Sequence, residues 1–311
     1  MPIDQNKPAG SVVIPAYKSR QTISACLESL LNQDTGLPYE VILVESSGDG
    51  AADIVREEFP SVRLIESRER LLSGAARNLG AESASGEILL FIDSDCIAEP
   101  GWIGKMWQAH REFDGAAVAG AVLNGNPESA VSVASYITEF SDFFPFGESR
   151  LMDYLPSCNL SYKADVFRKY GGFDPSQPLY VDLMFNRRLH AAGEKLLFRP
   201  DIEVAHKHRS RLDDYLRHEK SRGRAAVVAR RKGLLVGRWW VSRPILAYLT
   251  VAPLFARKAS VFSYRYARAY PSDGRMLARS LPIVWAGLLS WHYGFIRETI
   301  NGSKAGVKPY A

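Results

Sequence analysis

The sequence predicts an α/β protein with a mostly parallel central sheet flanked by helices, followed by a C-terminal helical extension. Over residues 11–120, short apolar runs rich in β-branched residues alternate with helix-like segments, as they do where helices cover a parallel sheet. Beyond about residue 209 a basic, helix-like segment at 209–232 precedes two uncharged apolar stretches, at 244–256 and 280–296.

Four strands are expected in order, and a helix should follow each of the first three. The strands are predicted at residues 11–15, 40–45, 62–66 and 87–92, and the helices at 22–33, 51–59 and 74–83. The last strand, EILLFI, is almost wholly apolar, as a strand buried on both faces should be. The loops after Ile14, Val44 and Ile92 therefore reach the carboxyl edge of the sheet, where open α/β sheets bind ligands.

The region after this sheet is mixed and then helical. Residues 140–156 form a loop rich in aromatic residues and prolines, and residues 182–192 are helix-like. The two later apolar stretches are shorter than the roughly 20 residues that span a bilayer, so we expect buried or interfacial helices. A plain helical subdomain is the alternative. The basic and aromatic residues typical of a membrane surface are Arg243, Arg257, Lys258, Trp239, Trp240, Trp285 and Trp291.

Composition narrows the class of protein. The 311 residues are 46% apolar and 23% charged, which is an ordinary globular composition. Three cysteines without a CxxC pair indicate neither a zinc knuckle nor a disulfide framework, and the first residues do not resemble a secretory signal, so we expect a cytoplasmic protein. The first 182 residues carry 14 basic and 26 acidic side chains, whereas the rest carry 25 and 8. The basic half is compatible with nucleic acid, anionic lipid, a phosphorylated substrate or simply a solvated face.

The triplet Asp93-Ser94-Asp95 is the strongest chemical signal. It directly follows the most apolar strand, so both carboxylates should emerge at the ligand-binding edge. Divalent Mg or Mn takes hard oxygen ligands and keeps water and phosphate oxygens in its shell. Any acidic turn can produce this triplet, so its position after a buried strand is what makes it informative.

The chain resembles the family 2 glycosyltransferases, whose catalytic domain has the fold called GT-A. The matching segments, in the family's order, are SVVIPAY (11–17), EVILVESSGDG (40–50), SGAARNLGAESASGEILLFIDSDC (73–96), CNLSYKADVFRKYGGFD (158–174) and VDLMFNRRLHAAG (181–193). The resemblance implies a catalytic domain at residues 1–210, with nucleotide-sugar binding at about 10–120 and the acceptor side at about 121–210. Residues 211–311 then form the basic, apolar helical region.

The resemblance also implies residues that bind the donor nucleotide. Pro15, Ala16 and Tyr17 would line the nucleoside pocket, and Glu45 stands where the family usually has an aspartate that binds the base. The extra methylene of Glu45 leaves the identity of the base open. Further donor contacts are implied for Arg77, Asp93 and Ser94. The alternative for Arg77 is a bridge to Asp93 or Glu45 without ligand contact, and the alternative for Tyr17 is a half-buried loop aromatic.

Inverting transfer needs a general base, and Asp182 is the candidate. In the family a Glu-Asp pair precedes the catalytic helix, with an Arg-Leu pair about six residues on, and Val181-Asp182 and Arg188-Leu189 match that spacing. Val181 replaces the glutamate, and Met184 replaces a frequent acidic residue. The alternative role for Asp182 is to cap the helix that follows.

The remaining assignments concern the metal and the acceptor. The resemblance implies Asp95 as the direct ligand of Mn or Mg, with His206 completing the shell. His208 should point to the same side as His206 if both lie on one extended strand. Asn159 begins the family's acceptor-side segment. Trp102 would stack on a sugar, or else be a core tryptophan.

The expected function is a transferase that moves a sugar, UDP-linked by preference, to a cell-envelope saccharide or lipid-linked acceptor. It would work at the inner face of the cell membrane, in peripheral association with anionic lipid. A nucleotidyltransferase and a catalytically weak sugar-nucleotide-binding protein are the alternatives. A dinucleotide-dependent oxidoreductase is disfavoured because no GxGxxG follows the first strand, and nucleic-acid binding is disfavoured because no such motif is present.

Overall fold

The computed structural model describes residues 7–301, and the chain divides into two compact units. The first unit consists of the chain up to Gly125 together with Gly147–His206. The second consists of Asn126–Phe146 together with the chain from Lys207 onward. Residues 126–146 thus belong with the C-terminal helices, although the sequence placed them with the catalytic domain.

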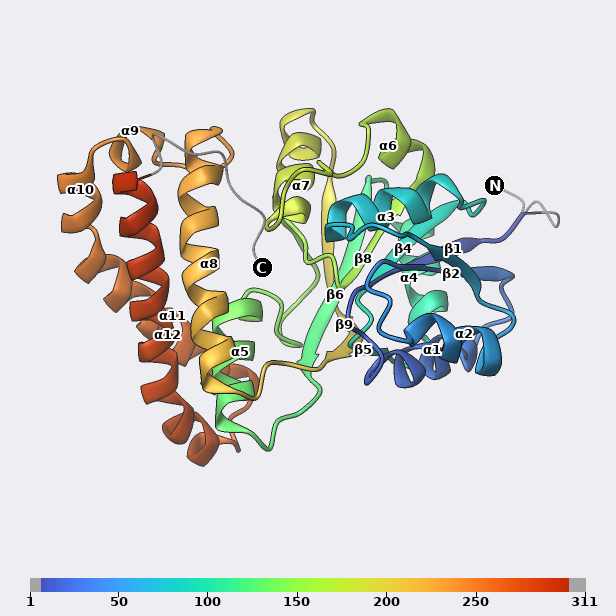
Figure 1. Ribbon diagram of the computed structural model, residues 1–311, viewed down its shortest axis with the longest axis horizontal. Coiled ribbons are helices and arrows are strands. Elements are labelled where there is room, and N and C mark those ends of the chain that lie inside the picture. The colour runs from blue at the N-terminus through green and yellow to red at the C-terminus, as the bar shows by residue number, and fades with distance from the viewer. Residues whose placement is uncertain (1–6, 302–311) are drawn as a thin grey trace. The chain divides into compact units, whose positions relative to one another are not determined.

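A mixed sheet forms the centre of the first unit (Figure 1). Its strands among the described residues are β1 (Gly10–Ala16), β2 (Tyr39–Glu45), β3 (Arg63–Glu66), β4 (Ile88–Ile92), β5 (Cys96–Ala98), β6 (Ala117–Asn124), β7 (Arg150–Leu151), β8 (Asn159–Lys163) and β9 (Leu196–His206). They are ordered β3-β2-β1-β4-β8-β6-β9-β5, and β7 pairs with β9. The four strands expected from the sequence are confirmed and run parallel to one another. The antiparallel strand β8 joins them to the second half of the sheet.

Helices cover both faces of this sheet. They are α1 (Ile23–Leu31), α2 (Ala51–Glu58), α3 (Ser73–Glu82), α4 (Trp102–Glu112), α6 (Ala164–Lys169) and α7 (Val181–Ala191). In Figure 1, α3 lies on one side of β1 and β2 while α1 and α2 lie on the other. The α3 helix approaches the sheet so closely that a Cβ at Gly80 would come within 2.4 Å of a Val13 methyl group. The first three helices confirm the expected α/β alternation.

The second unit is helical. Its helices are α5 (Ala130–Phe140), α8 (Leu212–Arg231), α9 (Arg238–Val241), α10 (Pro244–Leu249), α11 (Val251–Ala269) and α12 (Gly274–Asn301). The long helices α8 and α12 pack against each other, and α5 contacts both. The first apolar stretch is divided at Thr250 between α10 and α11, and the second lies inside α12. Within residues 7–301, none of the helices has the length and apolar character that crossing a bilayer requires.

Candidate active site

The end of β4 brings the candidate acidic residues to the carboxyl edge of the sheet. All five residues of β4 are buried, and the strand runs parallel to β1, which in turn runs parallel to β2. The chain leaves β4 at Ile92 and turns through Asp93, Ser94 and Asp95 before β5 begins. Both carboxylates therefore stand beyond a rigid, buried strand rather than on a solvated helix.

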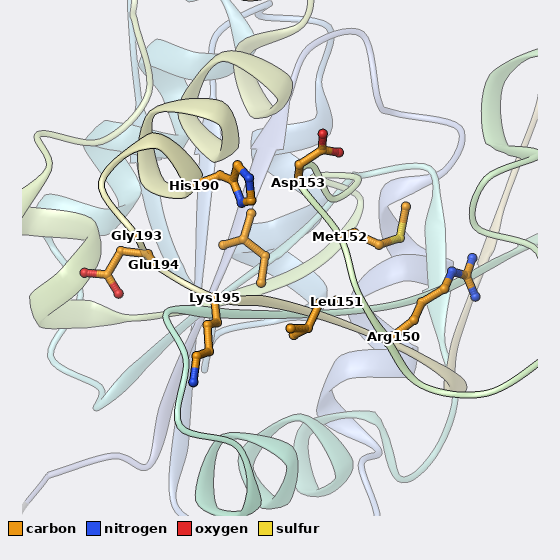
Figure 2. Close-up of a pocket in the computed structure, with 9 residues that line it drawn as sticks. Arg150, Leu151, Met152, Asp153, His190, Gly193, Glu194 and Lys195 are labelled. Atoms are coloured by element: carbon orange, nitrogen blue, oxygen red, sulfur yellow. The ribbon is translucent and has the colours of Figure 1, made fainter.

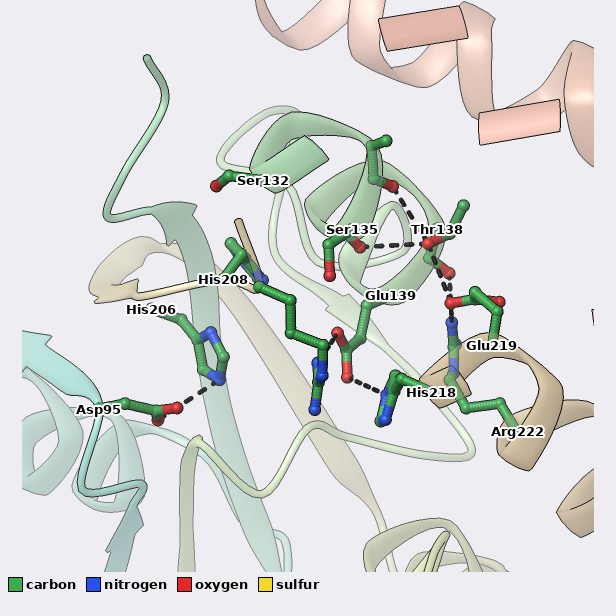
Figure 3. Close-up of polar contacts among 12 residues, drawn as sticks. Asp95, Ser132, Ser135, Thr138, Glu139, His206, His208, His218, Glu219 and Arg222 are labelled. Carbon is green, nitrogen blue, oxygen red and sulfur yellow. Dashed lines mark hydrogen bonds and ion pairs between the residues drawn. The ribbon is translucent and has the colours of Figure 1, made fainter. Parts of the chain in front are cut away.

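The register of β5 on β9 places Asp95 beside His206. Cys96 lies directly opposite His206 in this antiparallel pair. The Nε2 atom of His206 is 3.5 Å from Oδ1 of Asp95, as Figure 3 shows. The Asp95 side chain is 40% exposed and that of His206 is 10% exposed, so the pair has an open side on the carboxylate.

Asp95, Cys96 and His206 form a group that could hold a metal ion. One potential ligand atom from each of the three lies within 4.8 Å of the others. Burial raises the pKa of the Cys96 thiol well above its ordinary value, and hard ions such as Mn²⁺ and Mg²⁺ prefer oxygen to sulfur, so Cys96 is the weakest of the three donors. A carboxylate oxygen and an imidazole nitrogen remain. This donor set fits a divalent ion such as Mn²⁺, which fills its other positions with water or phosphate oxygens.

His208 does not share this site. The strand ends at His206, so strand alternation does not extend to residue 208, and our expectation of one common face is wrong. His208 belongs to the second unit, where its ring packs 5.2 Å from that of Tyr136 and 5.4 Å from that of Phe140. Its backbone N–H donates to the side-chain oxygen of Asn126.

Arg77 forms an ion pair with Asp93. Its Nη2 donates to Oδ1 of Asp93, and its guanidinium lies 5.9 Å from the centre of the Phe173 ring. Arg77 is only 3% exposed, because α3 presents it to the interior of the unit. The bridge to Asp93 that the sequence left open is therefore present. It orients the Asp93 carboxylate and leaves little of the guanidinium accessible to a nucleotide.

Asp182 is held at the start of α7 by two backbone groups. Its Oδ1 accepts the N–H of Leu183 at 2.8 Å, and its Oδ2 accepts the N–H of Ser157 at 3.0 Å. Tyr180 precedes it with φ at 60°, a left-handed conformation that tertiary structure must stabilise in a residue other than glycine. The helix begins at Val181 with Tyr180 as its N-cap and without a side-chain cap hydrogen bond, so Asp182 does not cap it, but its carboxylate is fixed in position.

The three acidic residues converge on one buried thiol. Burial raises the pKa of Cys158, and the nearby negative charges of Asp93, Asp182 and Asp95 raise it further. Strand register and hydrogen bonding place these residues around Cys158: Ile92, which precedes Asp93, lies opposite Asn159, and Oδ2 of Asp182 accepts the N–H of Ser157. The end of β4 and the starts of β5 and α7 are therefore close together at the edge of the sheet.

Glu45 is buried in the turn that follows β2. The residue is 2% exposed, and its carboxylate accepts the backbone N–H groups of Ser47 and Gly48 and the hydroxyl of Ser47. The longer glutamate side chain folds back onto its own turn. In this arrangement it has no surface with which to read a base.

Tyr17 is the exposed aromatic residue at the end of β1. It is 38% exposed, whereas Ala16 before it is buried and Pro15 is partly buried. The guanidinium of Arg70 lies 4.5 Å from the centre of the Tyr17 ring. Sequence reasoning missed Arg70, since 53 residues separate the two and only the parallel pairing of the strands brings their loops together. The Tyr17 ring and the Arg70 guanidinium together provide a flat aromatic surface and a positive charge beside the end of β1.

Trp102 and Asn159 do not support the acceptor-side role expected from the sequence. Both are fully buried, and Nε1 of Trp102 donates to Oδ1 of Asn159 at 2.8 Å. The amide nitrogen of Asn159 donates to the carbonyl oxygens of Ala121 and Ile202. The two side chains satisfy each other inside the sheet, so neither can touch an acceptor. Trp102 is therefore the core tryptophan of the alternative interpretation.

The aromatic loop at residues 140–156 is divided between the two units. Phe143 and Phe144 belong to the second unit and are buried, with the Phe144 ring 4.6 Å from that of Tyr136. Residues from Gly147 onward return to the first unit and form β7. Phe143 and Phe144 are therefore part of the core of the second unit.

A surface pocket of about 590 Å³ lies at the opposite end of β9 (Figure 2). Arg150 and Leu151 of β7 line it together with His190 of α7 and Lys195. Nine residues of extended chain lie between Leu196, at this end of β9, and His206, so the two ends are roughly 30 Å apart. This pocket is not the site of the acidic cluster.

Comparison with known proteins identifies the class that this fold and site define. The model of the glycosyl transferase family 2 matches residues 11–170, and the chain belongs to that family. It is a glycosyltransferase with the GT-A fold. The family assignment made from the sequence motifs is confirmed.

Two curated relatives illustrate the similarity. Glycosyltransferase AglE of Haloferax volcanii is 28% identical over 204 residues, which cover 64% of this chain and 67% of AglE. The putative glycosyltransferase EpsH of Bacillus subtilis is 26% identical over 204 residues, which cover 64% of this chain and 49% of EpsH. The aligned part is therefore about half of EpsH.

Solved structures share the fold. The mannosyltransferase PcManGT from Pyrobaculum calidifontis, in complex with GDP-Man and Mn²⁺, superposes with a TM-score of 0.64 at 19% identity, over 96% of this chain and 89% of PcManGT. GalNAc-T7 with UDP, GalNAc and Mn²⁺ gives a TM-score of 0.51 at 16% identity, over 66% of this chain and 45% of GalNAc-T7. At these identities the likeness concerns the fold.

Proposed function

We propose that this glycosyltransferase moves a sugar, with inversion, from a nucleoside-diphosphate donor to a hydroxyl group of a cell-envelope saccharide or lipid-linked acceptor. A UDP-sugar is the preferred donor, and a divalent cation, Mn or Mg, assists. The observation that carries the proposal is the grouping of Asp93, Asp95 and Asp182 at the carboxyl edge of the sheet, where β4 ends opposite β8, Asp95 lies beside His206, and Asp182 accepts the N–H of Ser157. The complexes of PcManGT with GDP-Man and Mn²⁺ and of GalNAc-T7 with UDP and Mn²⁺ support the donor class.

Asp95 and His206 would hold the cation. Bound there, a divalent ion would neutralise charge on the leaving diphosphate. Asp93 stands next to this position with its carboxylate fixed by Arg77, so it is placed to accept a hydrogen bond from the donor nucleotide. Ser94 lies between the two aspartates on the same turn, so we include it among the donor contacts.

The nucleoside would bind beside Tyr17. The residues that end β1, Pro15 and Ala16, form the floor of this position, and Tyr17 with Arg70 provides a cationic aromatic surface for a base or a phosphate. Arg77 contributes through Asp93. Glu45 would have to leave its turn before it could contact a base, so it is the weakest of the donor-side assignments.

Asp182 would act as the general base. In an inverting displacement the acceptor hydroxyl attacks the anomeric carbon while a carboxylate on the acceptor side takes its proton. Backbone N–H groups fix both oxygens of Asp182, and each carboxylate oxygen keeps a further lone pair for the hydroxyl. Val181 and Met184, which replace acidic residues of the family, are buried and apolar, so they support the helix rather than the reaction.

The cellular setting is part of the proposal. We place the catalytic site in the first unit, with the basic helical region in peripheral contact with the inner face of the cell membrane. The excess of basic side chains after residue 182 favours this location.

The test measures release of nucleoside diphosphate. The protein is incubated with a panel of nucleoside-diphosphate sugars and candidate acceptors, with Mn²⁺, Mg²⁺ or a chelator. We expect diphosphate release that the chelator abolishes and that Asp95→Asn lowers by about a hundredfold or more. Asp201→Asn is the matched control, because Asp201 is an exposed aspartate of β9 paired with Arg199.

Two other outcomes would replace the proposal. Release of pyrophosphate would identify a nucleotidyltransferase. Tight donor binding in thermal-shift measurements, without turnover under any metal condition, would identify a sugar-nucleotide-binding protein.

A further inference from the structure

The solvent-facing side of α12 is apolar. Trp285, Leu289 and Tyr293 are 48%, 60% and 57% exposed, and they follow one another at intervals of four residues. Side chains at this spacing lie on one face of a helix. On an ordinary surface helix that face is polar, whereas α12 is apolar on its exposed face as well as on its buried face, where Val284, Leu288 and Phe295 lie.

Arginines stand at both ends of this apolar stripe. Arg275 and Arg279 are exposed before it and Arg297 is exposed after it. Glu298, the acidic residue of α12, is turned inward to Arg224 of α8, 3.2 Å away. The exposed face of α12 therefore combines an aromatic and aliphatic centre with positive ends.

A second apolar group lies on the short helices α9 and α10. Trp239, Ile245, Tyr248 and Leu249 are all at least 65% exposed. Trp240 and Trp291 differ from the two exposed tryptophans, because both pack against Phe295 inside the unit. The sequence could not distinguish these two pairs.

Basic side chains predominate in the segment before α12, although Arg222, Arg224 and Arg265 pair with Glu219, Glu298 and Asp142. Residues 220–272 contain 12 lysines and arginines and no aspartate or glutamate. Arg238 and Arg243 are exposed, at the start of α9 and just before α10. An anionic partner would be attracted to such a surface, whereas a second copy of the same surface would be repelled.

We infer that the exposed faces of α12 and α9–α10 dock on an anionic phospholipid bilayer, with the apolar side chains entering the interface and the arginines contacting lipid phosphates. Tryptophan and tyrosine favour the depth at which headgroups meet acyl chains, and arginine binds phosphate. This inference rests on the peripheral membrane contact included in the proposed function, and it names the surface that makes this contact. It uses residues of the second unit alone and no residue of the proposed catalytic site.

The test compares vesicle binding of the full chain and three variants by co-sedimentation. Vesicles contain either phosphatidylcholine alone or phosphatidylcholine with phosphatidylglycerol. The first variant combines W285S, L289S and Y293S, the second combines R238Q and R243Q, and the third is the control L151S. Leu151 is an exposed leucine of β7 in the first unit, at 61% exposure.

We expect the full chain to bind the phosphatidylglycerol vesicles, and to bind less at high salt. The serine triple variant should lose affinity at least about tenfold, the arginine variant should lose most of its salt dependence, and L151S should bind as the unchanged chain does. Far-ultraviolet circular dichroism and solution diphosphate release identify variants that fail to fold. Because release is measured without vesicles, failure of the docking surface is distinguishable from failure of the proposed function.

Several results would overturn the inference. Two of them are retention of the full chain in the supernatant with anionic vesicles, and undiminished vesicle binding by the folded triple variant. A triple variant that instead changes the oligomeric state in light scattering would show that the stripe joins two copies of the chain.

Discussion

At the scale of single residues, Asp182 shows how backbone hydrogen bonds can orient the side chain that we propose as the general base. Its two oxygens accept N–H groups from different segments, Leu183 on its own helix and Ser157 before β8. The proposed base is therefore oriented without any contribution from the acidic neighbours that Val181 and Met184 replace.

We predict that Asp182→Asn abolishes transfer but preserves the fold. An amide cannot take a proton, so turnover should fall by roughly a hundredfold to ten-thousandfold, while the donor-induced thermal shift stays unchanged. Asp165→Asn is the control, since Asp165 accepts the N–H of Val166 at the start of α6 in the same way. Equal turnover of Asp182→Asn and the unchanged chain would rule out Asp182 as the base.

The residues of the site were predictable in part. Asp93 and Asp95 follow a wholly apolar strand, which is visible in the sequence itself. The contact of Asp95 with His206 depends on the register of β5 on β9, which no local pattern contains. For Glu45, Trp102 and Asn159 the sequence suggested ligand contacts, whereas their side chains bond to groups inside the protein. Sequence identifies a polar or aromatic side chain near a strand end, but the choice between a ligand and an internal partner is made by packing.

At the scale of elements, α8 and α12 approach each other through glycines. A Cβ on Gly223 of α8 would lie 1.9 Å from the carbonyl oxygen of Trp291, and one on Gly294 of α12 would lie 2.0 Å from that of Lys220. Backbone atoms cannot move aside as side-chain ends can. The helices are thus in backbone contact at two places.

We predict that Gly223→Ala destabilises the second unit by about 2–3 kcal/mol, because the methyl group forces the helices apart. Gly274→Ala at the start of α12 should be close to neutral, since a Cβ there would meet no other atom of residues 7–301 within 4 Å. Urea unfolding followed by circular dichroism measures both. Equal stability of the two variants would contradict the close contact.

A buried ion cluster joins α5 to α8. Glu139 lies 3.0 Å from His218, as Figure 3 shows. It also lies 3.2 Å from Arg209. Burial alone would raise the pKa of the Glu139 carboxyl, but the positive charges of His218 and Arg209 outweigh it and hold the pKa well below the ordinary value of 4.5. A carboxyl whose pKa is lowered by folding stabilises the folded state above its unfolded pKa. That stabilisation is lost as the pH falls from 4.5 through the folded value.

We predict that Glu139→Gln lowers the free energy of unfolding near neutral pH by roughly 2 kcal/mol, because the hydrogen bonds of the buried carboxylate with Arg209 and His218 lose their charge. Below pH 4.5 the variant and the unchanged chain should converge. Urea denaturation over a pH series tests this, with the exposed Glu128→Gln as control. A constant difference at all pH values would contradict the assigned ionisation.

The individual strands and helices were easier to predict than the unit to which each belongs. The strands β1 to β4 match the predicted ranges within about two residues, because apolar runs bounded by polar turns define them. The helix α5, AVSVASYITEF, was not predicted. Its β-branched and small residues have no helical pattern of charges, and its partners α8 and α12 follow far along the chain.

At the scale of the whole molecule, the second unit is assembled from two separate segments of chain. Residues 126–146 leave the first unit, form α5, and return before β7. Val133, Ala134, Tyr136 and Ile137 of α5 are buried in the second unit. The sequence showed the change in charge along the chain, but it could not show that an early segment crosses to the later unit.

We predict that a chain ending at His206 is insoluble, since α5 would lose α8, α11 and α12 and expose its apolar side. The same truncation with residues 126–146 replaced by a short glycine-serine linker should be soluble and should keep the donor-induced thermal shift. Solubility after expression and the melting temperature measure the difference. A soluble simple truncation would show that α5 does not depend on the C-terminal helices.

The positions of Cys26, Cys96 and Cys158 have a practical consequence. All three thiols of the chain are buried, and burial raises the pKa of each, so none is a good nucleophile toward solvent reagents. A single cysteine introduced on the surface would then be the sole group to take a maleimide dye. The native protein is already suited to fluorescence and spin-label work, without the removal of any residue near the acidic cluster.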